Sequence, residues 1–238
     1  MSLVETDWLE KNISSVKIID CSWHMPQTKR NGLEEYKNQH IPNSIFFDLD
    51  ANSKKEIDLP HMLVNQSDWE QIVSKMGVKN EDEIVIYDNS DVISSCRCWF
   101  NFIYFGHNPK LVHVLNGGLK KWIKENNEVT KNIINIQPSN YKSFEKKELV
   151  KNKKSINQNI NEQKFKVIDA RSKERFEGKV QEPRKGLRSG SIKNSFCIPF
   201  DQCLNENKTF KSKENLKLIF ETCLENINEK NIVFSCGS

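Results

Sequence analysis

An internal repeat constrains the fold of this chain more than any other feature of its sequence. The segment KIIDCSW at residues 17–23 matches KVIDARS at residues 166–172, and each has a short β-strand pattern that ends in an aspartate. Further along, HIPNSIFFDLD at residues 40–50 matches GSIKNSFCIPFD at residues 190–201. Segments that recur in the same order indicate two copies of one structural unit.

The spacing of a third pair of segments supports the repeat. EIVIYD ends at Asp88 and NIVFSC ends at Cys236, and both have the apolar pattern of a short buried strand. Asp88 lies 68 positions after Asp20, and Cys236 lies 67 positions after Asp169. We therefore expect Asp88 and Cys236 at the same place in the two copies, at the carboxyl end of a strand, where open α/β sheets collect their chemistry.

The alternation of segments predicts an α/β fold. Short apolar strands alternate with amphipathic stretches such as SDWEQIVSKMGV and ENLKLIFETCLENI, which indicates a parallel sheet flanked by helices in each copy. Residues 127–145 are polar, contain one proline and lack a sustained helical period, as is typical of a linker. We therefore expect an N-terminal domain at residues 1–126 and a C-terminal domain at residues 146–238.

Composition excludes several classes of protein. Hydrophobic residues make up 37% and charged residues 29% of the chain, and the net charge of +4 is spread along it, which does not favour nucleic-acid binding. No apolar run approaches the roughly 20 residues that span a bilayer, so no membrane association is expected. The start, MSLVETDWLEKN, lacks the basic end and apolar core of a signal peptide, and a cytoplasmic location follows as the expectation.

The seven cysteines form no regular framework. Cys96 and Cys98 make a CxC pair without a second ligand pair or a nearby histidine cluster, so no metal site is expected. Cys21, Cys197 and Cys203 lie near strand ends and have the character of small core residues. In a reducing compartment, at most one or two of the seven thiols should be reactive.

Seven motifs then carry a resemblance to a known family. They occur in the order DCSWHMP, EYKNQHIPNSIFFDLD, LPHML, GHNPKLVHVLNGGLKKW, VIDARSKERFEG, EPRKGLRSGSI and CGS. Together they cover nearly the whole chain and resemble the tandem-domain rhodanese family, and within it the branch that acts on 3-mercaptopyruvate. The resemblance implies two rhodanese-like domains, of which the first is catalytically silent and the second carries a cysteine nucleophile.

The resemblance places the nucleophile at Cys236. Asp88 stands where the first copy would need the cysteine, which agrees with a silent first domain. The family loop reads Cys-Gly-Ser in mercaptopyruvate enzymes and Cys-Arg-Lys in thiosulfate enzymes, so Gly237 and Ser238 favour mercaptopyruvate. Backbone N–H groups of such a loop surround the sulfur and stabilise both thiolate and persulfide.

Arginines are the implied substrate ligands. Arg175 and Arg184 match family positions that bind the carboxylate and carbonyl of mercaptopyruvate, and Arg188 is a third candidate. A guanidinium donates two parallel hydrogen bonds, which suits a carboxylate. The alternative is that this stretch is a solvated basic loop. Arg97 either faces the site from the silent domain or forms an ion pair within it.

A proton relay is implied by three further residues. Ser238, His61 and Asp50 match the hydroxyl, imidazole and carboxylate that assist the cysteine in the family. An imidazole held by a carboxylate can move protons through a hydroxyl to the leaving enolate or to the sulfur. The alternative makes His61 a loop histidine and Asp50 a turn residue.

The implied reaction is a ping-pong sulfur transfer. The thiolate takes the sulfur of 3-mercaptopyruvate, pyruvate leaves, and the persulfide passes its sulfur to a thiol such as thioredoxin or to cyanide, without a metal or organic cofactor. Two alternatives remain open: a thiosulfate sulfurtransferase, and a non-catalytic rhodanese-like binding module.

The end of the chain raises a further expectation. After Asp88 the first copy continues through residues 89–122 with a helix, a strand and a further cap, whereas the second copy ends two residues after Cys236. We therefore expect a chain truncated within the active-site loop, frayed over residues 231–238 and nearly inactive. Ser191 and Lys193 replace the family's usual His and Pro, at positions that shape a turn.

Overall fold

The computed structural model describes residues 2–55, 59–183, 186–225 and 231–236. The chain divides into two compact units, Met1–Leu149 and Val150–Ser238, each with its own sheet. The boundary lies a few residues after the predicted one, and the predicted linker belongs to the first unit. None of the helices in the described ranges is long and apolar enough to cross a bilayer.

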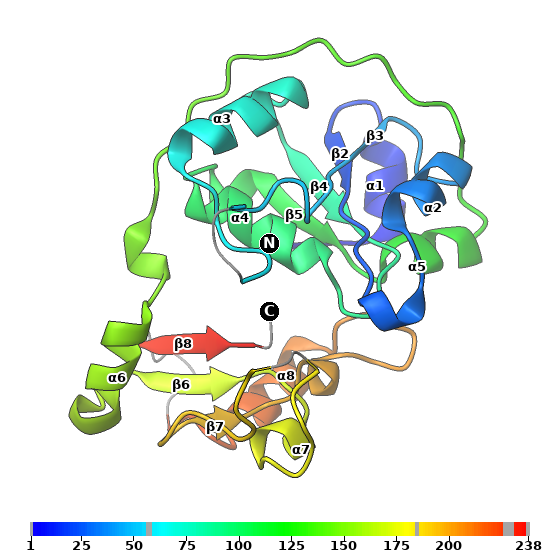
Figure 1. Cartoon of the computed structure of the whole chain (residues 1–238). Helices are drawn as coiled ribbons and strands as arrows, with labels where there is room; N and C mark the ends of the chain where they lie inside the picture. Colours follow the sequence, from blue (N-terminus) through cyan, green and yellow to red (C-terminus); the bar gives the residue numbers. More distant parts are fainter. Residues whose placement is uncertain (1, 56–58, 184–185, 226–230, 237–238) are drawn as a thin grey trace. The chain divides into compact units, whose positions relative to one another are not determined.

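The first unit is built on a five-stranded parallel sheet (Figure 1). Its strands, in spatial order, are β1 (Leu3–Val4), β5 (Val112–Leu115), β4 (Ile84–Tyr87), β2 (Lys17–Asp20) and β3 (Ser44–Phe46). The strands β2, β4 and β5 are almost entirely buried, which explains their continuous apolar sequence.

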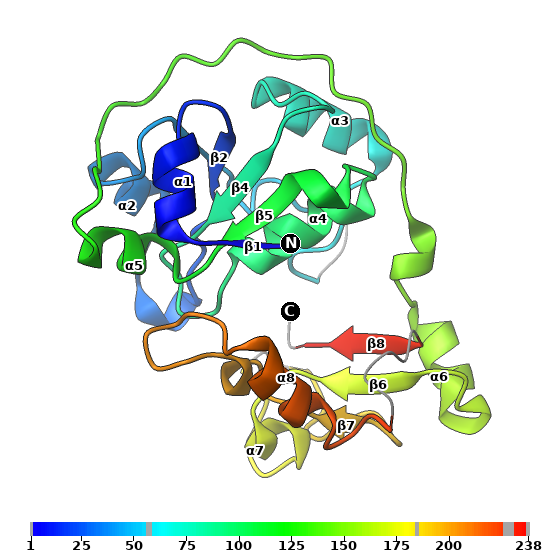
Figure 2. The same cartoon turned by 180° about the vertical axis from the view of Figure 1, so that it is seen from behind.

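Helices cover both faces of this sheet, as the turned view in Figure 2 also shows. They are α1 (Thr6–Asn12), α2 (Gly32–Asn38), α3 (Gln66–Lys75), α4 (Ser95–Tyr104) and α5 (Gly118–Lys124), with short 3₁₀ turns η1 (Pro26–Thr28), η2 (Pro109–Leu111) and η3 (Lys147–Leu149). Asn31 and Asn65 cap α2 and α3, because each side-chain oxygen accepts a hydrogen bond from a backbone N–H in the first turn.

Alternating strand residues divide the core of the first unit into two clusters. Ile19 and Ile86 pack with residues of α3 and α4, including Trp69, whereas Ile18 and Val85 pack on the other face with residues of α1 and α5. Successive strand side chains point to opposite faces, so neighbouring residues enter different clusters. This is the doubly wound arrangement expected from the sequence.

The predicted linker packs against the first unit. Tyr141 is 1% exposed and lies in the α3 and α4 cluster, where Ile134 and Ile136 also pack. Its hydroxyl and the ring of His107 are 3.0 Å apart. A short antiparallel bridge between His40 and Thr130 holds the beginning of the segment. A few spaced apolar residues are therefore enough to fix a stretch that has no regular secondary structure.

The second unit has a smaller parallel sheet. Its spatial order is β7 (Phe196–Cys197), β6 (Lys166–Asp169) and β8 (Ile232–Ser235). Its helices are α6 (Lys153–Glu162), α7 (Lys173–Phe176) and α8 (Lys213–Phe220), with the 3₁₀ turn η4 (Phe200–Cys203). The buried core is centred on Ile168, Ile198 and Leu224. The expectation that residues 231–238 fray is wrong for β8, which pairs with β6 along its whole length, and residues 237–238 lie outside the described residues.

The register of the two sheets agrees with the sequence repeat. In the first unit β2 pairs with β4 so that Asp20 lies opposite Tyr87, and in the second unit β6 pairs with β8 so that Asp169 lies opposite Ser235. The residue that follows β4 and the residue that follows β8 therefore occupy equivalent places.

A turn before β3 and before β7 is also shared. Residues 41–44 and 192–195 each close with a backbone hydrogen bond of 3.1 Å. Asn43 and Asn194 both have left-handed backbones, with φ of 63° and 65°. Asparagine tolerates this region at the third position of a turn, so the second copy keeps the turn despite its different sequence.

Candidate active site

Cys236 follows β8 directly, at the carboxyl end of the strand, and its side chain is exposed. Gly237 and Ser238, which the sequence assigned to the same loop, lie outside the described residues. Burial raises the pKa of Cys21, Cys197 and Cys203, so these thiols resist ionisation. Burial and the nearby Asp88 carboxylate raise the pKa of Cys96 to about 12.

Asp88 occupies the equivalent place in the first unit and is 5% exposed. One carboxylate oxygen accepts a hydrogen bond from the N–H of Ser90, and the other accepts one from the N–H of Ser95, each at 2.8 Å. Ser95 begins α4, so the carboxylate also lies at a helix amino terminus. The loop of the first unit thus surrounds a carboxylate with backbone N–H groups, and an aspartate rather than a cysteine occupies the position equivalent to Cys236.

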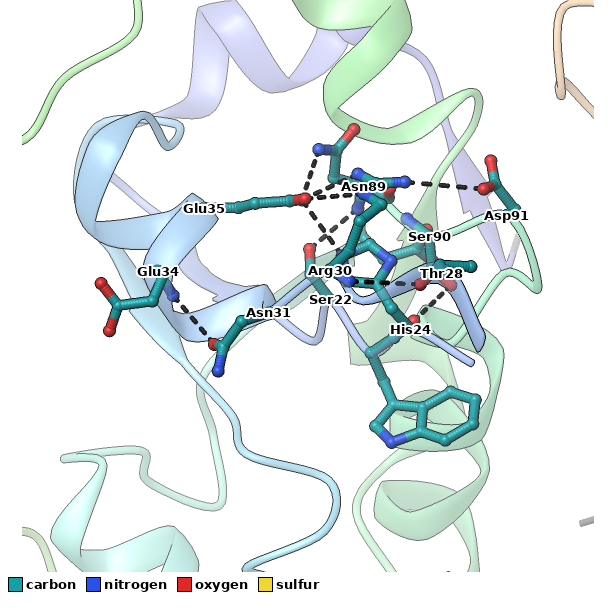
Figure 3. A network of polar contacts seen from close by, with 12 residues as sticks. Ser22, His24, Thr28, Arg30, Asn31, Glu34, Glu35, Asn89, Ser90 and Asp91 are labelled. Atoms are coloured by element: carbon teal, nitrogen blue, oxygen red, sulfur yellow. Dashed lines mark hydrogen bonds and ion pairs between the residues drawn. The ribbon is translucent and has the colours of Figure 1, made fainter. Parts of the chain in front are cut away.

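A polar network fixes this loop of the first unit (Figure 3). Glu35 accepts hydrogen bonds from Arg30 Nε at 2.7 Å, Arg30 Nη2 at 2.8 Å and Asn89 Nδ2 at 2.8 Å. His24 Nε2 lies 3.1 Å from the same carboxylate, and Arg30 Nη2 also donates to the carbonyl of Asn89 at 3.1 Å. Burial alone would raise the pKa of Glu35, but the hydrogen bonds from Arg30 and Asn89 outweigh it and lower the pKa.

The structure brings Asp50, His61 and Arg97 together in the first unit. His61 Nε2 lies 2.9 Å from Asp50 Oδ1, and Arg97 donates a hydrogen bond to the carbonyl of His61. The other oxygen of Asp50 accepts a hydrogen bond from Trp23 Nε1 at 2.9 Å, and the Trp23 ring meets the His61 ring edge-on at 4.7 Å. Sequence reasoning missed Trp23, although it lies in the motif DCSWHMP, because its pairing with Asp50 depends on the fold.

Arg175, in the second unit, is held by a glutamate. Its Nη2 and Nε lie 2.6 and 3.3 Å from the carboxylate oxygens of Glu182. Glu182 also accepts a hydrogen bond from Arg171 Nη1 at 2.8 Å, and Arg171 binds Asp169 through its Nε and Nη2. Hydrogen bonds from Arg175 and the charges of both arginines outweigh burial and lower the pKa of Glu182. The alternating charges of the DARS and EPR motifs were the signal that could have revealed this cluster.

The other two arginines predicted to bind substrate differ from Arg175. Arg188 is exposed and donates to the carbonyl of Ser191 at 3.3 Å. Arg184 lies outside the described residues. Within the described ranges, no group of three or more histidine, cysteine or acidic side chains is arranged to hold a metal ion.

The predicted site residues thus fall into two sets. Asp50, His61 and Arg97 belong to the first unit, whereas Cys236 and Arg175 belong to the second. The first set can hold and orient an imidazole, and the second combines an exposed thiol with a guanidinium fixed on one edge.

Comparison with known proteins identifies the family. The rhodanese-like domain family matches residues 5–125, and the thiosulfate/3-mercaptopyruvate sulfurtransferase 1, mitochondrial, of Arabidopsis thaliana is 36% identical over 99% of the chain and 68% of that relative. The chain belongs to the rhodanese family. This rhodanese-family chain is also 31% identical to the 3-mercaptopyruvate sulfurtransferase of Mus musculus. The match covers 100% of this chain and 82% of the mouse protein.

A solved structure agrees with this family membership. SseA from Escherichia coli, a 3-mercaptopyruvate sulfurtransferase, superposes with a TM-score of 0.87 at 28% identity, over 99% of this chain and 88% of SseA. The predicted resemblance and the predicted α/β class with parallel sheets flanked by helices are confirmed. The names of the relatives agree with the predicted sulfurtransferase activity. The cytoplasmic location stays a prediction, and the Arabidopsis relative is named as mitochondrial.

Proposed function

We propose that this rhodanese-family chain is a sulfurtransferase that moves sulfur from 3-mercaptopyruvate through Cys236 to a thiol or to cyanide. The observation that carries the proposal is the position of Cys236, an exposed thiol directly after β8 at the carboxyl edge of a parallel sheet. The names of the Mus musculus relative and of SseA support mercaptopyruvate as the donor.

The proposed first half-reaction forms a persulfide. The Cys236 thiolate attacks the sulfur of mercaptopyruvate, an S–S bond forms, and the C–S bond breaks with its electron pair moving to C3. The product leaves as the enolate of pyruvate, which then takes up a proton. Because thiolate is the reacting form, an exposed thiol has an advantage over the buried thiols, whose pKa is raised.

The second half-reaction returns the thiol. An acceptor thiolate attacks the outer sulfur of the Cys236 persulfide, and the inner S–S bond breaks to give an acceptor persulfide and the Cys236 thiolate. Cyanide reacts in the same way and leaves as thiocyanate. Thioredoxin is a thiol acceptor of the proposed kind, and no metal or organic cofactor takes part in either step.

The predicted site residues have distinct roles in this proposal. Arg175 and Arg184 bind the carboxylate and the carbonyl of the substrate, and Arg188 is a third contributor. Guanidinium groups suit this because they donate in parallel to two oxygens. The N–H groups of the loop that contains Gly237 stabilise the thiolate and the persulfide.

The proposed proton relay uses the contact between Asp50 and His61. Asp50 Oδ1 lies 2.9 Å from His61 Nε2 and thereby orients the ring. In the proposal the ring exchanges a proton with Ser238, which passes it to the leaving enolate. Arg97 supports the same loop through its hydrogen bond to the carbonyl of His61.

Thiosulfate is the second candidate donor, because the name of the Arabidopsis relative includes thiosulfate as well as 3-mercaptopyruvate. Thiosulfate is a dianion and would be favoured by additional cationic side chains next to the nucleophile. Gly237 and Ser238 provide none, so we expect higher kcat/KM with mercaptopyruvate than with thiosulfate.

Intact-protein mass spectrometry after brief treatment with 3-mercaptopyruvate tests the proposal. The chain should gain one sulfur atom, and subsequent cyanide should remove it. Cys236→Ser should abolish the gain, whereas the matched control Cys203→Ser should retain it. If the unsubstituted chain gains no sulfur from mercaptopyruvate or thiosulfate, the enzyme assignment fails and a non-catalytic binding module remains.

A further inference from the structure

Four charged side chains of the second unit form a continuous row of ion pairs. Asp169, at the end of β6, binds Arg171 at 2.7 Å; Arg171 binds Glu182 at 2.8 Å, and Glu182 binds Arg175 at 2.6 Å. The side chains of Asp169 and Glu182 are only 2% and 3% exposed, so these carboxylates need cationic partners. The row of ion pairs therefore runs from Asp169, at the end of β6, to Arg175.

Glu182 engages one edge of the Arg175 guanidinium. The Nε and Nη2 atoms of Arg175 both bind Glu182, whereas Nη1 makes no hydrogen bond to any described residue. The Arg175 side chain is 24% exposed, against 12% for Arg171. Arg171 is thus occupied on both sides by carboxylates, whereas Arg175 keeps one donor edge for another anion.

The first unit contains a similar ion pair, in which Glu35 binds the Nε and Nη2 atoms of Arg30 (Figure 3). Held in this way, Arg30 Nη2 also donates to the carbonyl of Asn89, in the loop after β4. That loop begins at Asp88, whose place after the strand corresponds to that of Cys236 in the second unit. In both units a glutamate binds an arginine through its Nε and Nη2 atoms.

We propose that Glu182 is the positioning residue for Arg175: it fixes the Nε and Nη2 edge so that Nη1 is directed to the substrate carboxylate. The inference rests on the proposed function, because it assigns the orientation of a substrate ligand of that site. Arg171 supports the arrangement by holding Glu182 from the opposite side. Glu182 itself touches neither the substrate nor the reacting sulfur.

Glu182 could either neutralise the charge of Arg175 or position its guanidinium, and these two roles predict opposite effects of Glu182→Gln on the KM. If Glu182 only neutralised Arg175, Glu182→Gln would leave a stronger positive charge and lower the KM for the anionic substrate. If Glu182 positions Arg175, the same substitution loosens the guanidinium and raises the KM. Glu182→Asp keeps the charge but shortens the side chain by one methylene. Neutralisation therefore predicts an unchanged KM in this variant, whereas positioning predicts a higher KM.

The test measures steady-state kinetics with 3-mercaptopyruvate as donor and cyanide as acceptor. Glu182→Gln and Glu182→Asp should each raise the KM for mercaptopyruvate about tenfold, the loss of roughly one charge-assisted hydrogen bond, with kcat changed less than about threefold. The KM for cyanide should not change, whereas general damage to the fold would alter both half-reactions. The matched control is Glu177→Gln, which removes a surface carboxylate that pairs with Lys179 and should leave every constant unchanged.

Two variants at Arg175 test the same role if the single Glu182 variants fold poorly. Arg175→Lys replaces the fork by a point charge and should raise the KM to the same extent, with Glu182 still held by Arg171. Adding Glu182→Gln to Arg175→Lys should cause little further change. A lower or unchanged KM in Glu182→Gln, or additive effects in the double variant, would overturn the inference.

A spectroscopic readout separates this inference from the proposed function. In ¹⁵N-labelled protein the Nε–H signal of Arg175 should exchange slowly with solvent, and pyruvate should shift it; Glu182→Gln should remove both properties. If the unsubstituted chain shows no turnover but retains these signals, the sulfurtransferase proposal fails and the positioning role stands. If the Arg175 signal exchanges rapidly in the unsubstituted chain, the positioning role fails whatever the activity.

Discussion

Asp20→Asn should change how the stability of the first unit depends on pH. Asp20 ends β2 and is 1% exposed, and one of its oxygens accepts a hydrogen bond from the N–H of Ser22 at 2.8 Å. Burial, opposed by hydrogen bonds from Ser22 and assisted by the nearby Asp88 charge, raises the pKa of Asp20 to about 7. Its counterpart Asp169 has Arg171 as a partner, whereas the corresponding residue in the first unit is Ser22.

The direction of this pH dependence follows from the number of protons that the folded and unfolded chains bind. Between the unfolded pKa of about 3.9 and the folded pKa of about 7, the folded chain binds more protons at Asp20 than the unfolded chain does. The contribution of Asp20 to stability is therefore fully present below about pH 4 and is lost as the pH rises to about 7. A shift of about three units corresponds to at most about 4 kcal/mol, and we expect 1 to 4 kcal/mol after local relaxation.

Urea unfolding monitored by tryptophan fluorescence measures this effect in the first unit alone, because all five tryptophans lie there. At pH 5 about 1.5 kcal/mol of this contribution, at most, is already lost, because Asp20 is largely ionised in the unfolded chain. At pH 8 Asp20→Asn should be more stable, by about 1 to 3 kcal/mol relative to the difference at pH 5. Parallel pH profiles for the two proteins would refute the reasoning.

Asp169→Asn is the matched comparison in the second unit. It removes one of the two carboxylate partners of the largely buried Arg171, so it should destabilise that unit at both pH values. Hydrogen exchange of the β6 amides reports this unit separately. A pH-dependent gain of stability in Asp169→Asn would show that the presence of Arg171 does not distinguish the two aspartates.

Three further predictions concern the site. Arg184→Ala should lower kcat/KM for mercaptopyruvate by roughly 10- to 1,000-fold, mainly through KM, in steady-state assays; unchanged kinetics would remove Arg184 from the carboxylate site. Asp88→Ala should lower the free energy of unfolding by about 1 to 3 kcal/mol in urea titrations, because two buried N–H groups lose their acceptor. Sulfur loading of Cys236 should stay intact in this variant, and a loss of loading would give Asp88 itself a role in the reaction. Trp23→Phe removes a donor to Asp50 and should change the pH profile of kcat while the KM for mercaptopyruvate stays the same; an unchanged profile would show that His61 needs no such support.

The strands could be predicted because their signal is local. Runs such as IVIY in β4 and KVID in β6 are buried on both faces, and each copy of the repeat reinforces the assignment of the other. The equivalence of Asp88 and Cys236 followed from spacing alone, and the strand registers agree with it. The pairing of Asp50 with His61 was accessible only through the family resemblance.

Side-chain partners and irregular segments could not be predicted in the same way. Glu182 and Trp23 are recognisable only when the fold brings them to Arg175 and Asp50, since no periodic pattern marks a hydrogen bond between distant positions. The segment at 127–145 has the composition of a linker, but Tyr141 inserts into the core and holds it. A single large aromatic side chain can fix an irregular stretch because its burial removes a large apolar area from water.

The distribution of indoles and thiols makes the chain a ready optical reporter. Its tryptophans lie in the first unit, whereas Cys236 is an exposed thiol in the second, and burial raises the pKa of Cys21, Cys96 and Cys203. An alkylating dye at neutral pH should therefore attach to Cys236 before it reaches those three thiols. Energy transfer from the indoles to such a dye would follow movement between the two units in solution without any engineered residue.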